Sequence, residues 1–308
     1  MCLLKVTGLT KTYKNKEDFV YALKGIDFSI NQGECLGLVG ESGCGKSTTA
    51  EIIARLIKKD SGTIMFNGAE ITGKKRLKCV GKDMQMVFQN PKDSFDPKYS
   101  LLESVMMGAD SYNLYSKTEL RQRAQELIKY VGLKESYLNK GIGSLSGGEC
   151  QKASIARAVI CSPKLIIFDE ATSALDVSVQ AQIIGLMRKL KEEKGVSFLF
   201  ITHDLALTSS ICDNIAVMYS GRIIEYGPCQ EVLKNPKHPY TKQLVSSVLP
   251  INGCCNIPEF NVLRNTEYTE NSCDFYAFCQ RADEKCAKGI LNMAQLQGRS
   301  VLCCHADD

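Results

Sequence analysis

The feature that most constrains the fold is a glycine-rich segment of eight residues: Gly40-Glu41-Ser42-Gly43-Cys44-Gly45-Lys46-Ser47. It fits the pattern G-x-x-x-x-G-K-[S/T] and lies between an expected strand that ends at Val39 and an expected helix that starts near Ser47. Glycines let such a loop turn tightly so that its backbone N–H groups point at phosphate oxygens, and the helix N-terminus adds its dipole. Lys46 would neutralise charge on the β- and γ-phosphates, and Ser47 would hold Mg²⁺. The segment, together with Thr48, is therefore a predicted nucleotide-phosphate site.

Short apolar segments separated by turn signals lie near the N-terminus. The segments at 3–6, 21–30 and 35–39 have the composition of strands. Between Thr63 and Ile71 the pair Asn67-Gly68 separates two further strand-like runs, which is a strong signal of a two-residue hairpin. We therefore expect an antiparallel β layer in this part of the chain.

Helical patterns follow the glycine-rich segment. Apolar residues recur at helical spacing between Ala50 and Ile57, and again between Leu120 and Val131. The second stripe follows Ser116-Lys117-Thr118-Glu119, which has the form of a capping box. We expect the chain from roughly 92 to 160 to be mainly helical.

Two later apolar runs predict the scaffold and a second part of the site. Leu165–Phe168 and Ser197–Thr202 are strand-like and each is followed by a helical pattern, which predicts a parallel α/β sheet. The first run ends in two carboxylates, Asp169 and Glu170, as the second acidic motif of phosphate-loop ATPases does. Asp169 would reach the Mg²⁺ shell and Glu170 would polarise the attacking water. The alternative is that the two acids only cap the next helix.

The segment Leu145-Ser146-Gly147-Gly148-Glu149 narrows the kind of ATPase. It resembles the signature motif of the ATP-binding cassette (ABC) family, and the following 150–158 continue in that family's manner. Ser146 and the two glycines, opening a helix, would form another anion-binding N-terminus. In the family, ATP is sandwiched between two cassettes, so the resemblance implies that Ser146, Gly147, Gly148 and Glu149 contact the ATP of the partner cassette.

The other motifs of the ABC family occur in order along the chain. Tyr13 resembles the aromatic that stacks on adenine, Gln89 the Q-loop glutamine, Ser173-Ala174-Leu175-Asp176 the D-loop and His203 the switch histidine. Taken singly, each residue is more simply explained by packing or by a solvated surface. Jointly, they imply a phosphate-loop cassette with a RecA-like core, an antiparallel β subdomain and a helical subdomain.

The resemblance also implies a role for each catalytic candidate. Glu170 would be the general base or water-orienting carboxylate, and His203 would contact the γ-phosphate. Gln89 would reach Mg²⁺, beside Ser47 and Asp169, and couple the nucleotide to the membrane partner. The catalytic set is therefore Glu170, His203, Lys46 and Gln89.

A second resemblance lies beyond the cassette. Asn235 to Leu244, with His238-Pro239-Tyr240 at its centre, resembles the element that follows the cassette in ATPases of dipeptide, oligopeptide and nickel importers. From the residues alone, two prolines bracket a turn and Tyr240 opens a helix. We expect an ATPase domain over 1–235, with its helical subdomain at about 92–160, and a cysteine-rich C-terminal region over 236–308.

Seven of the fifteen cysteines lie between Cys254 and Cys304. In the importer group a similarly spaced set of four cysteines is associated with an iron–sulfur cluster, which implies a [4Fe-4S] site on these residues: Cys273, Cys279, Cys286 and Cys304. Cys304 is preferred to Cys303 because it precedes His305, while Cys254 and Cys255 fit no such scheme. Zinc, unliganded thiols and disulfides are the alternatives.

Charge and hydropathy limit the partners. The 38 basic and 34 acidic side chains are interspersed and the formal net charge is +4, which gives no argument for nucleic acid. The N-terminal residues lack the regions of a signal peptide, and no apolar run approaches the ~20 residues that span a bilayer. We expect a chain in the cytosol that attaches to the membrane through a partner.

Two classes of function fit these motifs. The first is the ATP-hydrolysing subunit of an importer on the cytoplasmic face of the cell membrane, with peptides as the expected cargo and nickel or another metal complex as the alternative. The resemblance implies a second cassette, expected to be a paralogue, two transmembrane permeases and an extracytoplasmic substrate-binding protein. The second class is a soluble cassette ATPase of DNA repair or translation. Such proteins usually carry a coiled-coil insertion, a zinc hook or two fused cassettes, and none of these is found in the sequence.

Overall fold

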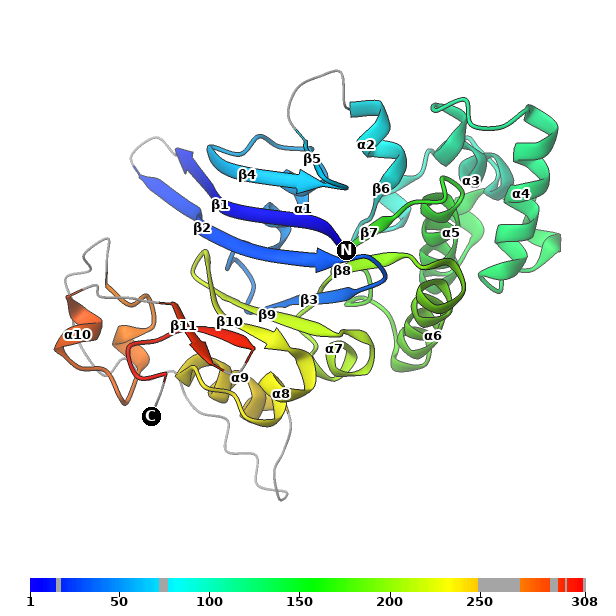
Figure 1. Ribbon diagram of the computed structural model, residues 1–308. Helices are drawn as coiled ribbons and strands as arrows, with labels where there is room; N and C mark the ends of the chain where they lie inside the picture. Colours follow the sequence, from blue (N-terminus) through cyan, green and yellow to red (C-terminus); the bar gives the residue numbers. More distant parts are fainter. Residues whose placement is uncertain (15–17, 72–76, 249–271, 289–292, 297, 307–308) are drawn as a thin grey trace.

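The computed structural model describes residues 1–14, 18–71, 77–248, 272–288, 293–296 and 298–306. The strands form two sheets, a four-stranded one near the N-terminus and an eight-stranded one through the centre. Three helices, α3 (Leu101–Asp110), α4 (Lys117–Tyr130) and α5 (Gly147–Val159), stand together at one side of the molecule, and the C-terminal residues lie at the opposite side (Figure 1).

The four-stranded sheet is the antiparallel layer expected from the sequence. Its strands, in the order β2-β1-β4-β5, are β2 (Phe19–Asn31), β1 (Cys2–Lys14), β4 (Ser61–Phe66) and β5 (Ala69–Glu70). Asn67 and Gly68 join β4 to β5 with positive φ angles of 49° and 75°, as a two-residue hairpin turn requires. The predicted hairpin is confirmed.

The eight-stranded sheet is parallel at its centre. In the order of the sheet, its strands are β11 (Met293–Leu296), β12 (Arg299–Leu302), β10 (Arg222–Pro228), β9 (Asn214–Tyr219), β3 (Cys35–Val39), β8 (Ser197–Ile201), β7 (Leu165–Asp169) and β6 (Met84–Val87). The five strands from β9 to β6 run parallel, and β10, β12 and β11 continue the sheet antiparallel. The predicted parallel α/β scaffold is confirmed.

The central strands are continuous apolar runs because both faces of this sheet are covered. Leu36 and Leu38 of β3 belong to the apolar cluster shared with the antiparallel layer, whereas Cys35 and Val39 belong to the cluster shared with the helices α3 to α9. Alternate residues of a strand point to opposite faces, so one apolar strand serves two cores.

The remaining helices are α1 (Lys46–Ile53), α2 (Leu77–Asp83), α6 (Val177–Lys194), α7 (Leu205–Ile211), α8 (Cys229–Lys234), α9 (Pro239–Val248) and α10 (Glu284–Ala287). Of the capping box predicted at Ser116, one hydrogen bond is confirmed: Ser116 caps α4 by accepting from the N–H of Glu119 at 3.3 Å. The apolar stripe predicted for α1 continued to Ile57, but the helix ends at Ile53. Arg55, with φ of 64°, ends it in a Schellman motif, so this part of the prediction was wrong.

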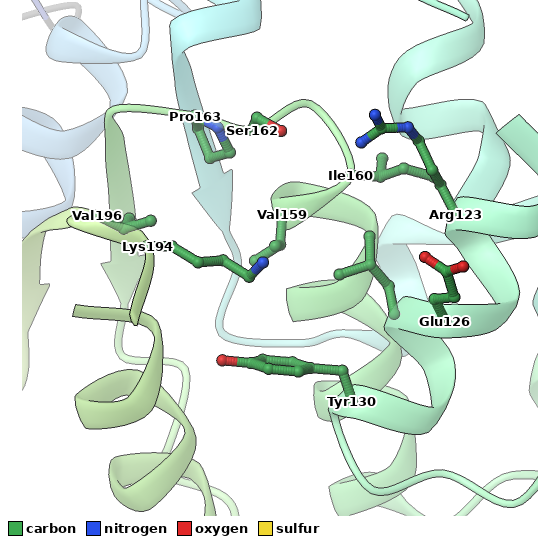
Figure 2. Close-up of a pocket in the computed structure, with 10 residues that line it drawn as sticks. Arg123, Glu126, Tyr130, Val159, Ile160, Ser162, Pro163, Lys194 and Val196 are labelled. Atoms are coloured by element: carbon green, nitrogen blue, oxygen red, sulfur yellow. The ribbon is translucent and has the colours of Figure 1, made fainter. Parts of the chain in front are cut away.

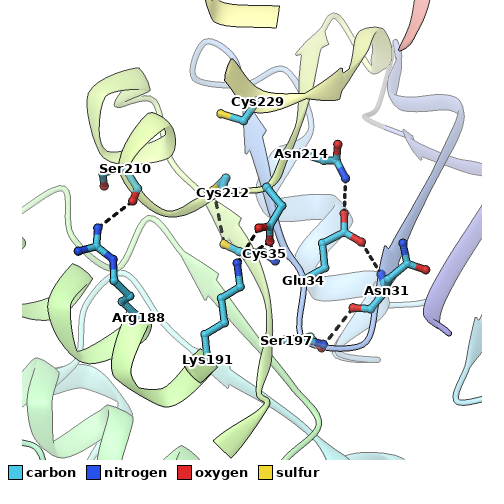
Figure 3. Close-up of polar contacts among 12 residues, drawn as sticks. Asn31, Glu34, Cys35, Arg188, Lys191, Ser197, Ser210, Cys212, Asn214 and Cys229 are labelled. Atoms are coloured by element: carbon cyan, nitrogen blue, oxygen red, sulfur yellow. Dashed lines mark hydrogen bonds and ion pairs between the residues drawn. The ribbon is translucent and has the colours of Figure 1, made fainter. Parts of the chain in front are cut away.

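The amino end of β3 is held by polar contacts that Figure 3 shows. Glu34 accepts hydrogen bonds from the side chain of Asn214 at 2.6 Å and from the N–H of Asn31 at 2.7 Å. The N–H of Cys35 donates to Asp213 at 2.7 Å, and the Cys35 and Cys212 sulfurs lie 3.5 Å apart. These bonds join β3 to the start of β9, and so fix the strand that leads into the glycine-rich segment.

The last described residues join the central sheet. β12 pairs with β10 through Glu225 opposite Val301 and Tyr226 opposite Ser300. A strand of the C-terminal region thus extends the sheet of the ATPase domain, so the two regions share one sheet. The division of the chain into two domains at residue 235 remains a prediction. Within the described ranges, no helix is both long and apolar enough to cross a membrane.

Candidate functional site

The phosphate loop and the predicted catalytic residues lie at one edge of the central sheet. The carboxyl ends of parallel strands meet at the same edge. Gly40 follows β3 and Gln89 follows β6. Asp169 is the last residue of β7, with Glu170 next, and His203 lies exposed between β8 and α7. Because β3, β8, β7 and β6 are consecutive neighbours, the topology gathers segments that are distant in sequence.

Lys46 is buried inside the loop that it belongs to. Its ammonium donates to the carbonyl oxygens of Gly40 at 2.9 Å and Glu41 at 2.8 Å, and it lies 3.8 Å from a carboxylate oxygen of Glu170. Only 3 % of Lys46 is exposed. A buried ammonium with carbonyl and carboxylate partners can neutralise phosphate charge.

Two glycines of the loop are required by its geometry. Gly40 has φ of 151°, and a Cβ there would lie 2.2 Å from the carbonyl oxygen of Met218. Gly45 has φ of 108°, precedes α1, and leaves no room for a side chain beside the carbonyl of Ala22. The loop therefore passes closer to its neighbours than any other residue type would allow.

A pocket of about 600 Å³ opens above the loop. Its described lining consists of Phe19, Val20, Tyr21, Ala22, Lys24, Ser42, Gly43, Gly45, Lys46, Ser47, Thr48, Glu170, Ser220 and Gly221. Tyr13, expected to stack on adenine, is not part of this described lining and pairs with Val20 across the sheet. Phe19 and Tyr21, which are 57 % and 51 % exposed, lie there instead. Sequence reasoning missed them, although exposed aromatics in a strand beside the loop were a usable signal.

Ser47 and Asp169 form the part of the site suited to a metal ion. The Ser47 hydroxyl donates to the Asp169 carboxylate at 3.0 Å, so both oxygens face the same space at the loop. Burial raises the pKa of Asp169 above its ordinary value, which is the situation of a carboxylate that gains from a nearby cation. Hydroxyl and carboxylate oxygens are ligands that Mg²⁺ prefers, and the residues present fit that ion.

Glu170 lies between the loop and the Q-loop residue. The amide of Gln89 donates to the Glu170 carboxylate at 3.2 Å and lies 3.4 Å from the Ser173 hydroxyl. Glu170 has φ of 46°, a left-handed conformation that is uncommon outside glycine and that clusters at functional sites. The structure thus brings Glu170, Lys46 and Gln89 together.

The signature segment lies outside the loop pocket. Ser146 caps α5 in a capping box with Glu149, whose carboxylate accepts from the Ser146 N–H at 2.9 Å. Gly147 lines a separate pocket with Gln89 and Leu175, and no signature residue is in the described lining of the loop pocket. Among the described residues, Gly147 therefore lies beside Gln89 and Leu175, in a different pocket from the phosphate loop.

The C-terminal thiols form a cluster among the described residues. Burial, and then the nearby thiols of Cys286, Cys279 and Cys303, raise the pKa of Cys273 to about 12. Burial and Cys286 raise the pKa of Cys304 to about 11. The thiol of Cys303 also interacts with those of Cys279 and Cys286, so it lies near three of the predicted ligands, and Cys304 lies near Cys286.

A mixed donor set overlaps the thiol cluster. Donor atoms of Asp283, Cys286 and His305 all lie within 4.8 Å of one another, an arrangement that zinc accepts. Cys254 and Cys255 lie outside the described residues.

A second large pocket is separate from all predicted site residues. It measures about 420 Å³ and lies between α4, the end of α5 and the start of β8, with Arg123, Tyr130 and Lys194 around it (Figure 2). None of the described residues that line it belongs to the motifs above. The loop pocket is therefore the better candidate for nucleotide.

Comparisons with known families agree with this geometry. Residues 23–173 match the ABC transporter family, and residues 224–286 match the C-terminal region of oligopeptide/dipeptide transporters. A solved dimeric cassette in a post-hydrolysis state, MJ0796 bound to ADP and phosphate, superposes with a TM-score of 0.68 at 31 % identity, covering 74 % of this chain and 99 % of that one.

Two relatives match a larger share of this chain than the solved cassette does. The oligopeptide transport ATP-binding protein OppF of Bacillus subtilis (strain 168) is 43 % identical over 250 residues, which cover 80 % of this chain and 82 % of the relative. OppF of Escherichia coli (strain K12) is 40 % identical over 280 residues, covering 87 % and 82 %. The chain therefore belongs to the ABC transporter family of ATPases, within the group that carries the oligopeptide/dipeptide transporter C-terminal region.

Proposed function

We propose that this chain is the ATP-hydrolysing subunit of an importer that couples ATP binding and hydrolysis to the uptake of di- and oligopeptides through membrane permeases. The observation that carries the ATP-hydrolysing part of the proposal is the position of Glu170, whose carboxylate lies 3.8 Å from Lys46 and 3.2 Å from Gln89 at the phosphate loop. A carboxylate so placed can orient water toward a phosphate that Lys46 holds.

In this proposal each residue of the site has a separate role in ATP hydrolysis. The loop N–H groups and Lys46 hold the β- and γ-phosphates, and Lys46, which has three N–H donors, keeps the Gly40 carbonyl as a partner while it donates to phosphate oxygens. Glu170 orients the attacking water, and His203 contacts the γ-phosphate. Ser47 and Asp169, with Gln89, would hold Mg²⁺, which supplies charge neutralisation when bound. Catalysis is mainly positioning, because phosphoryl transfer demands little covalent chemistry from the protein.

A second cassette completes the site in this proposal. Ser146, Gly147 and Gly148 begin α5 outside their own phosphate pocket, so their helix N-terminus is available to the ATP of a partner. The solved relative MJ0796 is described as dimeric, which supports the same arrangement.

Glu170→Gln tests the catalytic assignment. In the assembled transporter we expect the variant to bind ATP and to hydrolyse it at least about 100-fold more slowly, because the amide cannot act as a base. Glu103→Gln is a matched control, since Glu103 is exposed and its carboxylate accepts hydrogen bonds from Ser100 at the start of α3. Near-normal hydrolysis by Glu170→Gln would refute the assignment.

Cargo and partners are proposed from the relatives. Those reported above are named oligopeptide transport ATP-binding proteins, which favours peptides over nickel and over a role in DNA repair or translation. We place the chain on the cytoplasmic face of the membrane, bound to two permeases and a paralogous cassette, with a substrate-binding protein outside. Purification of the tagged chain from solubilised membranes, with mass spectrometry of bound proteins, tests this. Recovery of only ribosomal or DNA-repair proteins would contradict it.

For the thiol cluster we propose an iron–sulfur centre on Cys273, Cys279 and Cys286, with the fourth ligand from the pair Cys303 and Cys304. The mutual proximity of these thiols supports the proposal. Anaerobically purified protein should contain iron and sulfide and absorb in the sulfur-to-iron charge-transfer region. Zinc without iron would instead support the mixed site of Asp283, Cys286 and His305.

A further inference from the structure

The segment His238-Pro239-Tyr240 forms a tightly fixed start to α9. The ring nitrogen Nδ1 of His238 accepts from the N–H of Tyr240 at 3.1 Å, so His238 acts as the helix cap. Pro239 takes the first helical position, where no N–H is needed. The N–H of His238 donates to Glu225, a fully buried carboxylate of β10, at 3.0 Å. These bonds fix the direction in which Tyr240 leaves the helix.

The ring of Tyr240 is held equally firmly. It is fully buried, and its centroid lies 4.6 Å from that of Tyr219 and 5.7 Å from that of Phe275. Phe275 belongs to the cysteine-rich region and also packs edge-on against Tyr219 at 5.4 Å. Burial raises the pKa of Tyr240, so the phenol stays neutral. The hydroxyl therefore occupies a fixed position.

That hydroxyl contacts the phosphate loop. The N–H of Glu41 donates to the Tyr240 oxygen at 3.1 Å. The same peptide unit carries the carbonyl of Gly40, which accepts from the Lys46 ammonium at 2.9 Å. In a planar trans peptide the N–H and C=O point in opposite directions. Tyr240 on one side and Lys46 on the other therefore fix a single peptide plane.

Other contacts hold the C-terminal region against the nucleotide pocket. Asp274, next to Phe275, forms ion pairs with Lys24 and with Arg222, the latter at 3.0 Å. Lys24 itself lines the pocket. The region after the cassette thus contacts the pocket lining through Asp274 and the phosphate loop through Tyr240.

We propose that Tyr240 is a positioning residue of the nucleotide site, whose hydroxyl holds the Gly40–Glu41 peptide in the orientation that presents Lys46 to the phosphates of ATP. This inference rests on the proposed ATPase function and adds the His-Pro-Tyr element to its nucleotide site. Without the hydroxyl, the Glu41 N–H loses its partner and the peptide plane turns toward another acceptor. The Gly40 carbonyl then moves away from Lys46.

Tyr240→Phe tests the inference because it keeps the ring and removes the hydroxyl. We expect the dissociation constant of the full-length chain for a fluorescent ATP analogue, displaced by MgATP, to rise roughly three- to tenfold. In the assembled transporter, KM for ATP should rise by the same factor while kcat changes by less than about twofold. Tyr226→Phe is the matched control, since it removes a half-buried hydroxyl that donates to the Ser29 carbonyl at 3.2 Å, and it should leave ATP affinity unchanged.

A double-mutant cycle separates positioning from general packing. Phe275→Leu should weaken ATP binding in the wild-type background, and should weaken it no further in Tyr240→Phe, if its effect passes through the hydroxyl. Equal ATP affinity in Tyr240→Phe and wild type, or equal losses in Tyr240→Phe and Tyr226→Phe, would overturn the inference. Lys46→Ala separates a failure of the nucleotide site from a failure of the Tyr240 inference. If Lys46→Ala binds ATP as tightly as wild type does, the assignment of the phosphate loop as the nucleotide site is wrong.

Discussion

His238 should make the stability of this protein depend on pH in a way that one substitution removes. It is 2 % exposed, and burial lowers the pKa of His238 from its ordinary value of 6.5 to about 3. The folded chain therefore keeps this imidazole neutral where the unfolded chain protonates it. The contribution of the neutral imidazole to the free energy of unfolding is fully present above pH 6.5 and is lost as the pH falls from 6.5 toward 3.

The size of the effect follows from the two pKa values. Each unit of difference corresponds to about 1.36 kcal/mol. A pH of about 5 lies roughly 1.5 units below the pKa of the histidine in the unfolded chain, so the unfolded state is protonated while the folded state remains neutral. This one group therefore lowers the free energy of unfolding by about 2 kcal/mol relative to about pH 7.5. A loss of that size is a large fraction of the stability of an ordinary domain.

His238→Asn removes the titration and keeps the cap, because asparagine can accept the Tyr240 N–H as His238 does. Urea unfolding at about pH 7.5 and about pH 5 should show wild type losing about 2 kcal/mol more than the variant. His203→Asn, which removes an exposed histidine, should behave as wild type. Equal losses in wild type and His238→Asn would refute the reasoning, as would a His238 imidazole NMR signal that titrates near pH 6.5.

Three further substitutions test the fold and the loop. Gly40→Ala should weaken ATP-analogue binding by roughly tenfold or more, because its Cβ meets the Met218 carbonyl at 2.2 Å; unchanged binding would mean that the loop tolerates a side chain there. Asp176→Ala removes the helix cap that accepts from the Val179 N–H at 2.9 Å, and should lower the free energy of unfolding by about 1 kcal/mol in urea titration. An unchanged free energy of unfolding would mean that water replaces the cap. Phe198→Ala, at a fully buried position of β8, should cost about 3 to 5 kcal/mol in the same assay, and a cost below about 1 kcal/mol would show that the core closes around the cavity.

Much of the fold could be predicted because its signals are local. Leu165 to Phe168 is a short unbroken apolar run that ends in two acids, which favours a strand covered on both faces, and β7 is such a strand. Asn67-Gly68 specified a turn by its own backbone preferences. Strand order is different, because nothing local to β3 says that β8 and β9 will flank it. That order depends on how long connections cross the sheet.

The candidate site divides in the same way. Lys46 and Glu170 were found from motifs that contain their own structural context, a strand followed by a helix or a strand ending in acids. Tyr13 was chosen by resemblance alone, and its role in stacking on adenine stays a prediction, while Phe19 and Tyr21 on the neighbouring strand lie in the described lining of the pocket. Which of two paired strands lines a pocket depends on how the sheet twists and how the strands pair, and the residues around Tyr13 do not specify this locally.

The His-Pro-Tyr element shows which features neighbouring residues predict and which depend on a contact distant in sequence. The sequence predicted that two prolines bracket a turn and that Tyr240 opens a helix, and the helix starts one residue earlier, at Pro239. Neither proline explains why the residue after Pro239 is a tyrosine, since any side chain that favours a helix would continue it. The explanation lies 199 residues away, at the N–H of Glu41. A buried hydroxyl needs a partner, and a loop that must hold its peptides in one orientation needs a fixed acceptor. Tyr240 meets both needs at once, and only the folded chain brings them together.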